Sequence, residues 1–141
     1  MPTSHEERQL LAEADRRALG YYDGIDSRPV FPPPAAIAAL QAFEQPLPEQ
    51  GLNDLEVLRQ LDEIGSPATV ASNGPRYFGF VIGATLPAAA AAERMVLAWD
   101  QCASSFDNAP VADVLERTAG RWVLEALDLP RSSAVSFGTS A

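Results

Sequence analysis

The first quarter of the chain places apolar residues at helical spacing. Ser4 followed three residues later by Glu7 has the pattern of a capping box, in which each residue caps the other's backbone N–H. Apolar positions then recur on one face, and Glu13 and Arg17 can pair one turn apart on the other. The pattern predicts a helix from Ser4 to Gly20, where the glycine is a typical stop.

Prolines and caps divide the next stretch into a linker and two helices. Residues 21–34 contain four prolines and an Asp-Gly turn signal, which predicts an irregular linker. Pro34 can occupy the first turn of a short helix over 35–43. Asn53 is a helix N-cap candidate, and the apolar stripe behind it reaches Gly65, which fits a C-cap.

The middle of the chain is the most apolar part. The run YFGFVI over 77–82 is aromatic and β-branched, which favours a short strand or extended segment. Pro87 can open a helix that runs to about Cys102. The first turns of this helix, residues 88–92, are alanine on every side. We therefore expect it to be the most buried element of the fold.

The last part of the chain predicts one amphipathic helix and a short strand. Asn108 or Ala109 begins a helix that has Pro110 in its first turn and is closed by Pro130, and its stripe runs from Val111 through Trp122 to Ala126. The apolar run 134–137 reads as a second short strand. Neither strand has an obvious partner in the chain, so we expect a partner from outside it. The predicted fold class is mainly α.

Composition narrows the function. The chain has 141 residues, of which 47% are hydrophobic, enough for a core. Its net charge of −9 argues against nucleic acid and anionic membranes as partners. The polar, acidic N-terminus does not resemble a signal peptide, and no apolar run is long enough for a membrane span, so we expect a cytoplasmic protein. All ten basic residues are arginine, so no side chain can form a Schiff base.

Few residues indicate chemistry directly. A single cysteine, Cys102, and a single histidine, His5, allow neither an internal disulfide nor an ordinary zinc site. The two tryptophans, Trp99 and Trp122, read as core or interface anchors. The strongest local signal is the Gly-Thr-Ser run 138–140 after a short strand, which resembles a phosphate-binding turn, although an ordinary polar tail has the same pattern.

Longer motifs give a family resemblance. The matching stretches are SPATVASNGPRYFGFVIGATLPAA (66–89), AWDQCASSFDNAPVADVLE (98–116) and RWVLEALDLP (121–130), together with YYDGIDSRPVFPPPAAIAAL (21–40). In this order and spacing they resemble the N-terminal part of the pyridoxal-phosphate-dependent group II decarboxylases, which act on aromatic amino acids, histidine or glutamate.

The resemblance implies an architecture and two sets of site residues. It implies the aspartate-aminotransferase-like α/β fold, called fold type I, in a homodimer. Residues 1–65 would be a helical dimerisation arm, and 66–141 the start of the cofactor-binding large domain. By matching position, the phosphate of pyridoxal 5'-phosphate would be bound by Gly138, Thr139 and Ser140, and the substrate side of the pocket would be lined by Phe80, Val81 and Ile82.

The implied activity is release of CO₂ from an L-amino acid. The apolar YFGFVI segment favours an aromatic substrate. The family's catalytic lysine, its ring-stacking histidine and its pyridine-pairing aspartate lie further along, so the resemblance places no catalytic residue in this chain, and we expect the chain alone to be inactive. Two alternatives stay open, namely a helical dimerisation or interaction module without catalysis, and a transaminase of the same fold.

Overall fold

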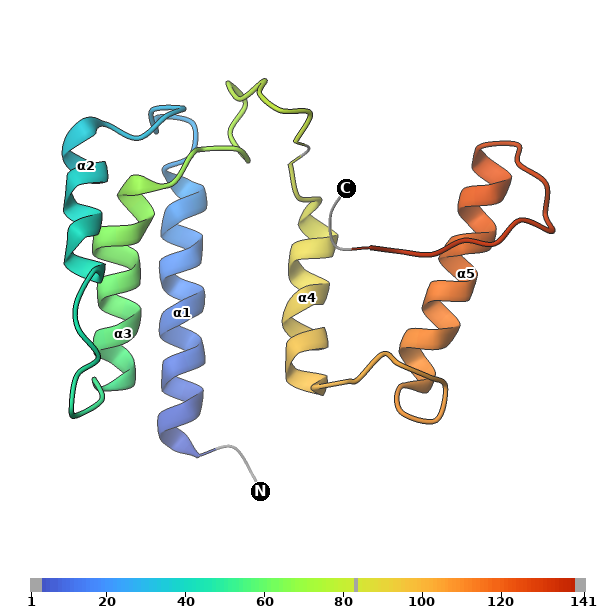
Figure 1. Cartoon of the computed structure of the whole chain (residues 1–141), viewed down its shortest axis with the longest axis horizontal. Helices are drawn as coiled ribbons and strands as arrows, with labels where there is room; N and C mark the ends of the chain where they lie inside the picture. Colours follow the sequence, from blue (N-terminus) through green and yellow to red (C-terminus); the bar gives the residue numbers. More distant parts are fainter. Residues whose placement is uncertain (1–3, 83, 139–141) are drawn as a thin grey trace. The chain divides into compact units, whose positions relative to one another are not determined.

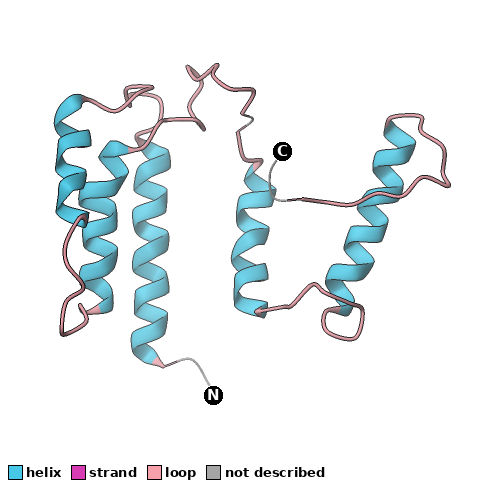
Figure 2. Ribbon diagram, viewed as in Figure 1, coloured by secondary structure: helices cyan, strands magenta, loops and turns pink. Residues whose placement is uncertain are grey.

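The computed structural model describes residues 4–82 and 84–138, and within these ranges its regular elements are all helical (Figure 2). The chain divides into two units, Met1–Thr85 and Leu86–Ala141, which are described separately. The expectation of a mainly α chain is therefore confirmed. The predicted boundary at 65/66 concerns functional regions and stays a prediction.

The α-helices are α1 (His5–Asp23), α2 (Pro34–Ala39), α3 (Asp54–Gln60), α4 (Pro87–Trp99) and α5 (Pro110–Ala126).

Helix α1 begins as predicted and ends later. The Ser4 hydroxyl accepts the Glu7 N–H at 3.1 Å, and the Glu7 carboxylate accepts the Ser4 N–H at 2.6 Å, which is the predicted capping box. The predicted stop at Gly20 is wrong, because the helix continues to Asp23 and is capped by Gly24. A glycine inside a helix costs only about 1 kcal/mol, which the following turn can offset.

The proline and asparagine signals of the first unit are confirmed. Pro34 opens α2, which continues as the 3-10 turn η1 (Leu40–Phe43). The Asn53 side chain accepts the Leu55 N–H at 2.9 Å and caps α3. The expected C-cap at Gly65 is wrong.

Gly65 keeps a helical backbone with φ −76°. The chain therefore continues from α3 through a π-helical turn η2 (Leu61–Gly65) into a 3-10 turn η3 (Ser66–Ala68).

In the first unit, α3 lies between α2 and α1 (Figure 1). The loop after η3 is fixed to the linker, where the Ala71 N–H donates to the Val30 carbonyl at 3.0 Å. Ala71 is buried and Pro32 of the proline-rich linker is also buried. The helices themselves contribute no fully buried residue to this unit.

In the second unit, α4 starts at Pro87 as predicted but departs from the prediction twice. It ends at Trp99 rather than near Cys102, because Asp100 adopts a left-handed backbone with φ 49° and ψ 50°. The expected burial of residues 88–92 is also wrong, since all are exposed except the half-buried Ala90. Apolar composition shows that a helix needs a covering surface, but it does not supply that surface.

Helix α5 starts at Pro110, one or two residues after the predicted start at Asn108 or Ala109, and has Pro110 in its first turn as predicted, but a different side of it is covered. The buried residues of α5 are Gly120 and Leu124. Trp122, which the predicted stripe includes, is 68% exposed. The reason is the segment after the helix, which folds back so that Val135 lies against Gly120, where an added Cβ would be 3.3 Å from the Val135 Cβ.

The two predicted strands are absent from the described chain. Residues 77–79 form no regular structure, and the Ile82 N–H donates to the Gly79 carbonyl at 3.3 Å, closing a turn through Phe80 and Val81. Residues 134–137 belong to no strand either. A strand needs a neighbour for its backbone groups, and no described segment provides one.

Candidate functional site

The residues expected to bind a cofactor phosphate are placed only in part. Gly138 is exposed at the end of the segment that follows α5. Thr139 and Ser140 lie outside the described residues. The structure therefore describes no phosphate-binding turn at this position.

The residues expected to line a substrate pocket form an exposed turn instead. Phe80 and Val81 have φ values of 55° and 56° and are 91% and 104% exposed, and Ile82 is 54% exposed. Two successive positive φ angles are typical of a type I′ turn, which glycine, asparagine and aspartate favour and a β-branched valine does not. This segment is thus strained and presents its apolar side chains to solvent.

The first unit contains an open cavity of about 400 Å³ beside α1 and the end of α3. Its walls are mainly apolar, with Ala14 and Ala18 from α1 facing Leu58 and Leu61. A salt bridge between Arg17 and Asp62 also borders it, as do Tyr21, Tyr22 and Thr69. A cavity with apolar walls and a few polar groups at its edge is suited to binding, so this face is the candidate interaction site of the unit.

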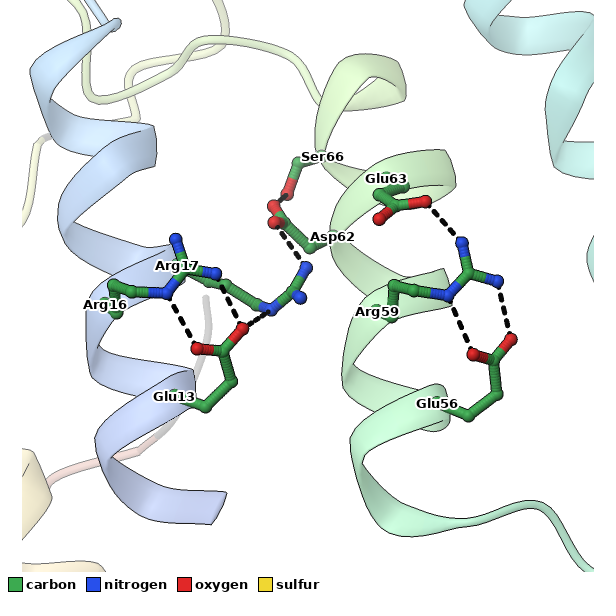
Figure 3. Close-up of polar contacts among 8 residues, drawn as sticks. All are labelled: Glu13, Arg16, Arg17, Glu56, Arg59, Asp62, Glu63 and Ser66. Carbon is green, nitrogen blue, oxygen red and sulfur yellow. Dashed lines mark hydrogen bonds and ion pairs between the residues drawn. The ribbon is translucent and has the colours of Figure 1, made fainter. Parts of the chain in front are cut away.

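Ion pairs fix the two helices beside this cavity (Figure 3). Arg17 joins Glu13 of its own helix at 2.7 Å to Asp62 of η2 at 2.9 Å. Asp62 also accepts the Ser66 hydroxyl at 2.9 Å. The Arg17 side chain is 18% exposed, so this contact between α1 and η2 is shielded from solvent more than an ordinary surface pair.

Two carboxyl groups on these helices have strongly lowered pKa values. The bidentate hydrogen bond from Arg16, together with Arg17, lowers the pKa of Glu13 to about 2. The hydrogen bonds from Arg59 lower the pKa of Glu56 to about 2. In both cases a guanidinium stabilises the ionised carboxylate. Both carboxylates are half-buried while Arg16 and Arg59 are exposed, and each pair stabilises the helix on which it lies.

A second group of contacts gathers around Tyr21 and Arg28. The Tyr21 hydroxyl lies 2.8 Å from the Thr69 hydroxyl, and the Arg28 guanidinium lies 4.1 Å above the Tyr21 ring. Arg28 also donates to the Ser66 carbonyl at 2.7 Å, and Arg76 donates to the Arg28 carbonyl. These contacts hold the linker on the end of α1. Sequence reasoning missed the hydrogen bonds among them because these join residues 38 to 48 positions apart, a distance at which no spacing rule applies.

Apolar exposure is the dominant property of the chain. Its buried hydrophobic residues in the described ranges are Ala71, Ala109 and Leu124. The chain exposes 11561 Å², whereas a folded monomer of 15.1 kDa exposes about 7100 Å². Even two separate domains of the sizes of the two units would together expose about 8500 Å². Separating the two units can only add exposed area, so the units taken by themselves expose at least this much.

Helix α4 shows this exposure most clearly. Met95, Val96 and Leu97 are 56%, 51% and 74% exposed, and Trp99 at its end is 42% exposed. Residues around the helix, rather than along one stripe, are therefore accessible. Large exposed apolar surfaces mark places where a protein contacts another surface. The expectation that the tryptophans serve as core anchors is wrong, and that of an interface role stays open.

No protein-family model matches the chain, and neither the curated proteins nor the solved structures contain a significant match. In the described residues no group of three or more histidine, cysteine, aspartate or glutamate side chains is placed to hold a metal ion. Within the same residues, no helix combines the length and the apolar character that crossing a membrane requires.

Proposed function

We propose that this chain is the N-terminal portion of a pyridoxal-phosphate-dependent decarboxylase of L-amino acids, and that its own contribution is surface for assembly. The observation that carries the proposal is the exposed apolar helix α4. The first turns of α4, residues 88–92, are apolar on all sides, and helical segments of this kind are normally covered by another surface. The family comes from the resemblance of the motif stretches given above, which include most of α5 and the two ends of α4 but not residues 90–97.

The described residues do not by themselves form a site for pyridoxal phosphate. The chain has no lysine for the covalent link to the cofactor, and Gly138 is exposed. Phe80, Val81 and Ile82 form an exposed turn rather than a pocket wall. We therefore assign no catalytic step to residues of this chain. The proposal requires that the cofactor be held by groups elsewhere in the assembled enzyme.

The enzyme proposal is tested on the complete product of the gene. It is purified with pyridoxal phosphate and given a panel of L-amino acids, with CO₂ and keto acid measured in parallel. We expect CO₂ from an aromatic amino acid, because the resemblance would place the YFGFVI segment on the substrate side of the pocket in the assembled enzyme, where it offers no charge to an acidic side chain. Reaction of glutamate but not of tyrosine or tryptophan contradicts the substrate class. Keto acid without CO₂ supports the transaminase alternative, and absence of both reactions contradicts the enzyme proposal.

The 141-residue chain alone provides a second test. Mixed with pyridoxal phosphate and reduced with borohydride, it should yield no cofactor linked to a side chain and no CO₂, because it contains no lysine. The N-terminal amine can react slowly, so the modified residue is located by peptide mapping. Cofactor trapped at any other position, or any turnover, contradicts the prediction.

The second candidate function is an interaction module without catalysis. The exposed Phe31, at 68%, and the exposed Trp122, at 68%, favour it, because aromatic residues are enriched in protein interfaces. Light scattering on the chain, with Leu97→Glu on α4 as the test variant and Glu93→Gln as the control, measures association directly. Both candidates predict association that Leu97→Glu weakens. A monomer that binds no apolar dye contradicts both.

A further inference from the structure

The second unit contains a cavity that the proposed function does not use. It has a volume of about 480 Å³ and lies between α5 and the segment that follows it. Sites for small molecules typically have volumes of about 300–1000 Å³. The cavity combines an apolar floor with a cationic rim, and each is built by residues of this unit.

The floor is apolar and closely packed. Gly120 and Leu124 of α5 are buried, and Leu124 is only 5% exposed. Val135 of the returning segment completes the floor, and it can approach because Gly120 has no side chain. An added Cβ at Gly120 would be 3.3 Å from the Val135 Cβ, a tight contact. The glycine therefore sets how closely the segment folds onto the helix.

The rim carries three of the ten arginines of a chain whose net charge is −9. Arg117 and Arg121 lie one turn apart on α5 and so share a face. Arg117 is paired with Asp113 at 2.7 Å. In the described part of the chain, Arg121 contacts the Thr118 hydroxyl at 3.3 Å and no carboxylate.

Arg131 approaches the cavity from the returning segment and is held by the helix end. Its guanidinium donates to the carbonyls of Leu124 at 2.5 Å and Leu129 at 2.8 Å. These bonds use one nitrogen, Nη1, so the remaining N–H groups of the fork are available. Ser133 adds a hydroxyl to the rim, and Glu116 adds one negative charge.

We propose that this cavity binds a small phosphate-bearing molecule, with Arg121 and Arg131 as its principal donors. The planar fork of arginine matches the oxygens of a phosphate group, and a charge-assisted hydrogen bond is about twice as strong as a neutral one. The hydroxyls of Thr118 and Ser133 add neutral donors. The apolar floor accommodates the organic part of the ligand. This site uses none of the residues expected to bind the phosphate of pyridoxal phosphate.

The proposal is tested by nuclear magnetic resonance on the full chain, titrated with inorganic phosphate and with phenyl phosphate at constant ionic strength. We expect saturable shifts at Thr118, Arg121 and Ser133. Phenyl phosphate should bind several-fold more tightly because its ring contacts the floor. Arg121→Gln should weaken binding at least about tenfold, since it removes a charged donor. Arg8→Gln, which removes one charge from α1, should leave binding unchanged.

Three other results would overturn the proposed phosphate site or the role of the Arg121 fork. Resonance shifts that rise with phosphate without saturating, in the same way as shifts in a control titration with sodium chloride, overturn the proposal. So does saturable binding that Arg121→Gln leaves intact. If Arg121→Gln alters the backbone signals of α5, Arg121→Lys replaces it, because lysine keeps the charge and loses the fork. Binding by Arg121→Lys as tight as that of the original chain overturns the role of the fork.

Discussion

The two units are built by different kinds of contact. In the first, single side chains join distant parts of the sequence, as Arg17 joins Asp62 and Tyr21 joins Thr69 across 45 and 48 positions. In the second, the bonds around α5 are local, and Arg131 reaches back only seven positions to Leu124. The first unit is therefore held together largely by hydrogen bonds and ion pairs between distant residues, with little buried apolar surface. The second depends on three buried residues, Ala109, Gly120 and Leu124, among those the structure describes.

Removing that leucine should have the largest effect. Leu124→Ala takes away the one large side chain of α5 that is buried, at 5% exposed, and leaves a void beneath Val135. We expect the free energy of unfolding of the second unit to fall by about 2–3 kcal/mol, at the lower end for buried leucines because little surrounds the site. Urea unfolding followed by α5 resonances measures it. Leu127→Ala, whose leucine is 64% exposed, should change the free energy by less than about 0.5 kcal/mol.

Removing the Arg17–Asp62 salt bridge of the first unit should lower the free energy of unfolding by a smaller amount. Arg17→Gln removes the contact between α1 and η2 and leaves Asp62 without its cation. We expect a loss of about 1–2 kcal/mol in the free energy of unfolding of the first unit. The matched control is Arg16→Gln, whose arginine is 66% exposed and pairs only within α1, and whose cost should be near 0.5 kcal/mol. Equal losses in the two variants would show that the Arg17–Asp62 salt bridge between α1 and η2 adds no more stability than an ion pair within one helix.

The contrast between the units also explains what the sequence could predict. Local signals gave the starts of all the long helices, because a capping box at Ser4 or a proline at position 87 or 110 acts within one turn. Burial could not be predicted in the same way. The alanines of α4 indicate a helix that needs covering, but the covering surface is not encoded in the helix. The same holds for the predicted strands, whose pairing depends on segments other than themselves.

The candidate sites show the same limit. The Glu13–Arg17 pair follows from i, i+4 spacing and is present, whereas the second partner of Arg17, Asp62, is visible only in the structure. The arginine-rimmed cavity was missed as well. Its residues on α5 are one turn apart, but Arg131 joins them through the returning segment, which its hydrogen bonds to the Leu124 and Leu129 carbonyls and the contact of Val135 with Gly120 hold on the helix.

The carboxylates of Glu13 and Glu56 should stay ionised until the pH falls well below the ordinary carboxyl pKa. The pKa values of Glu13 and Glu56 lie near 2, below the ordinary value of 4.5. A carboxyl whose pKa is lowered by folding contributes stability that is present above pH 4.5 and is lost as the pH falls toward 2. Carboxyl resonances titrated from pH 7 to pH 2 should show both groups still ionised at pH 3. Midpoints near 4.5 would mean that the arginine contacts are not maintained in solution.

The smallest expected effect concerns the strained turn of the first unit. Val81 has a φ of 56° at a position that is fully exposed, so its side chain gains nothing from packing while its backbone is strained. The left-handed conformation costs such a residue roughly 1–2 kcal/mol. Glycine removes that cost but adds about 0.5–1 kcal/mol of backbone entropy to the unfolded chain. Val81→Gly should therefore raise the free energy of unfolding by less than about 1 kcal/mol.

The comparison variant is Val70→Gly, which lies in the same unit outside any positive-φ position and should only destabilise. The sign of the change in free energy of unfolding that Val81→Gly causes distinguishes two states of the YFGFVI segment. If the turn persists in solution, Val81→Gly is the more stable of the two variants and exceeds the original chain. If the segment is extended in solution, as its β-branched and aromatic residues favour, glycine at position 81 loses strand propensity, and Val81→Gly, like Val70→Gly, is less stable than the original chain. The strain at Val81 would then belong to a conformation that the free chain does not keep.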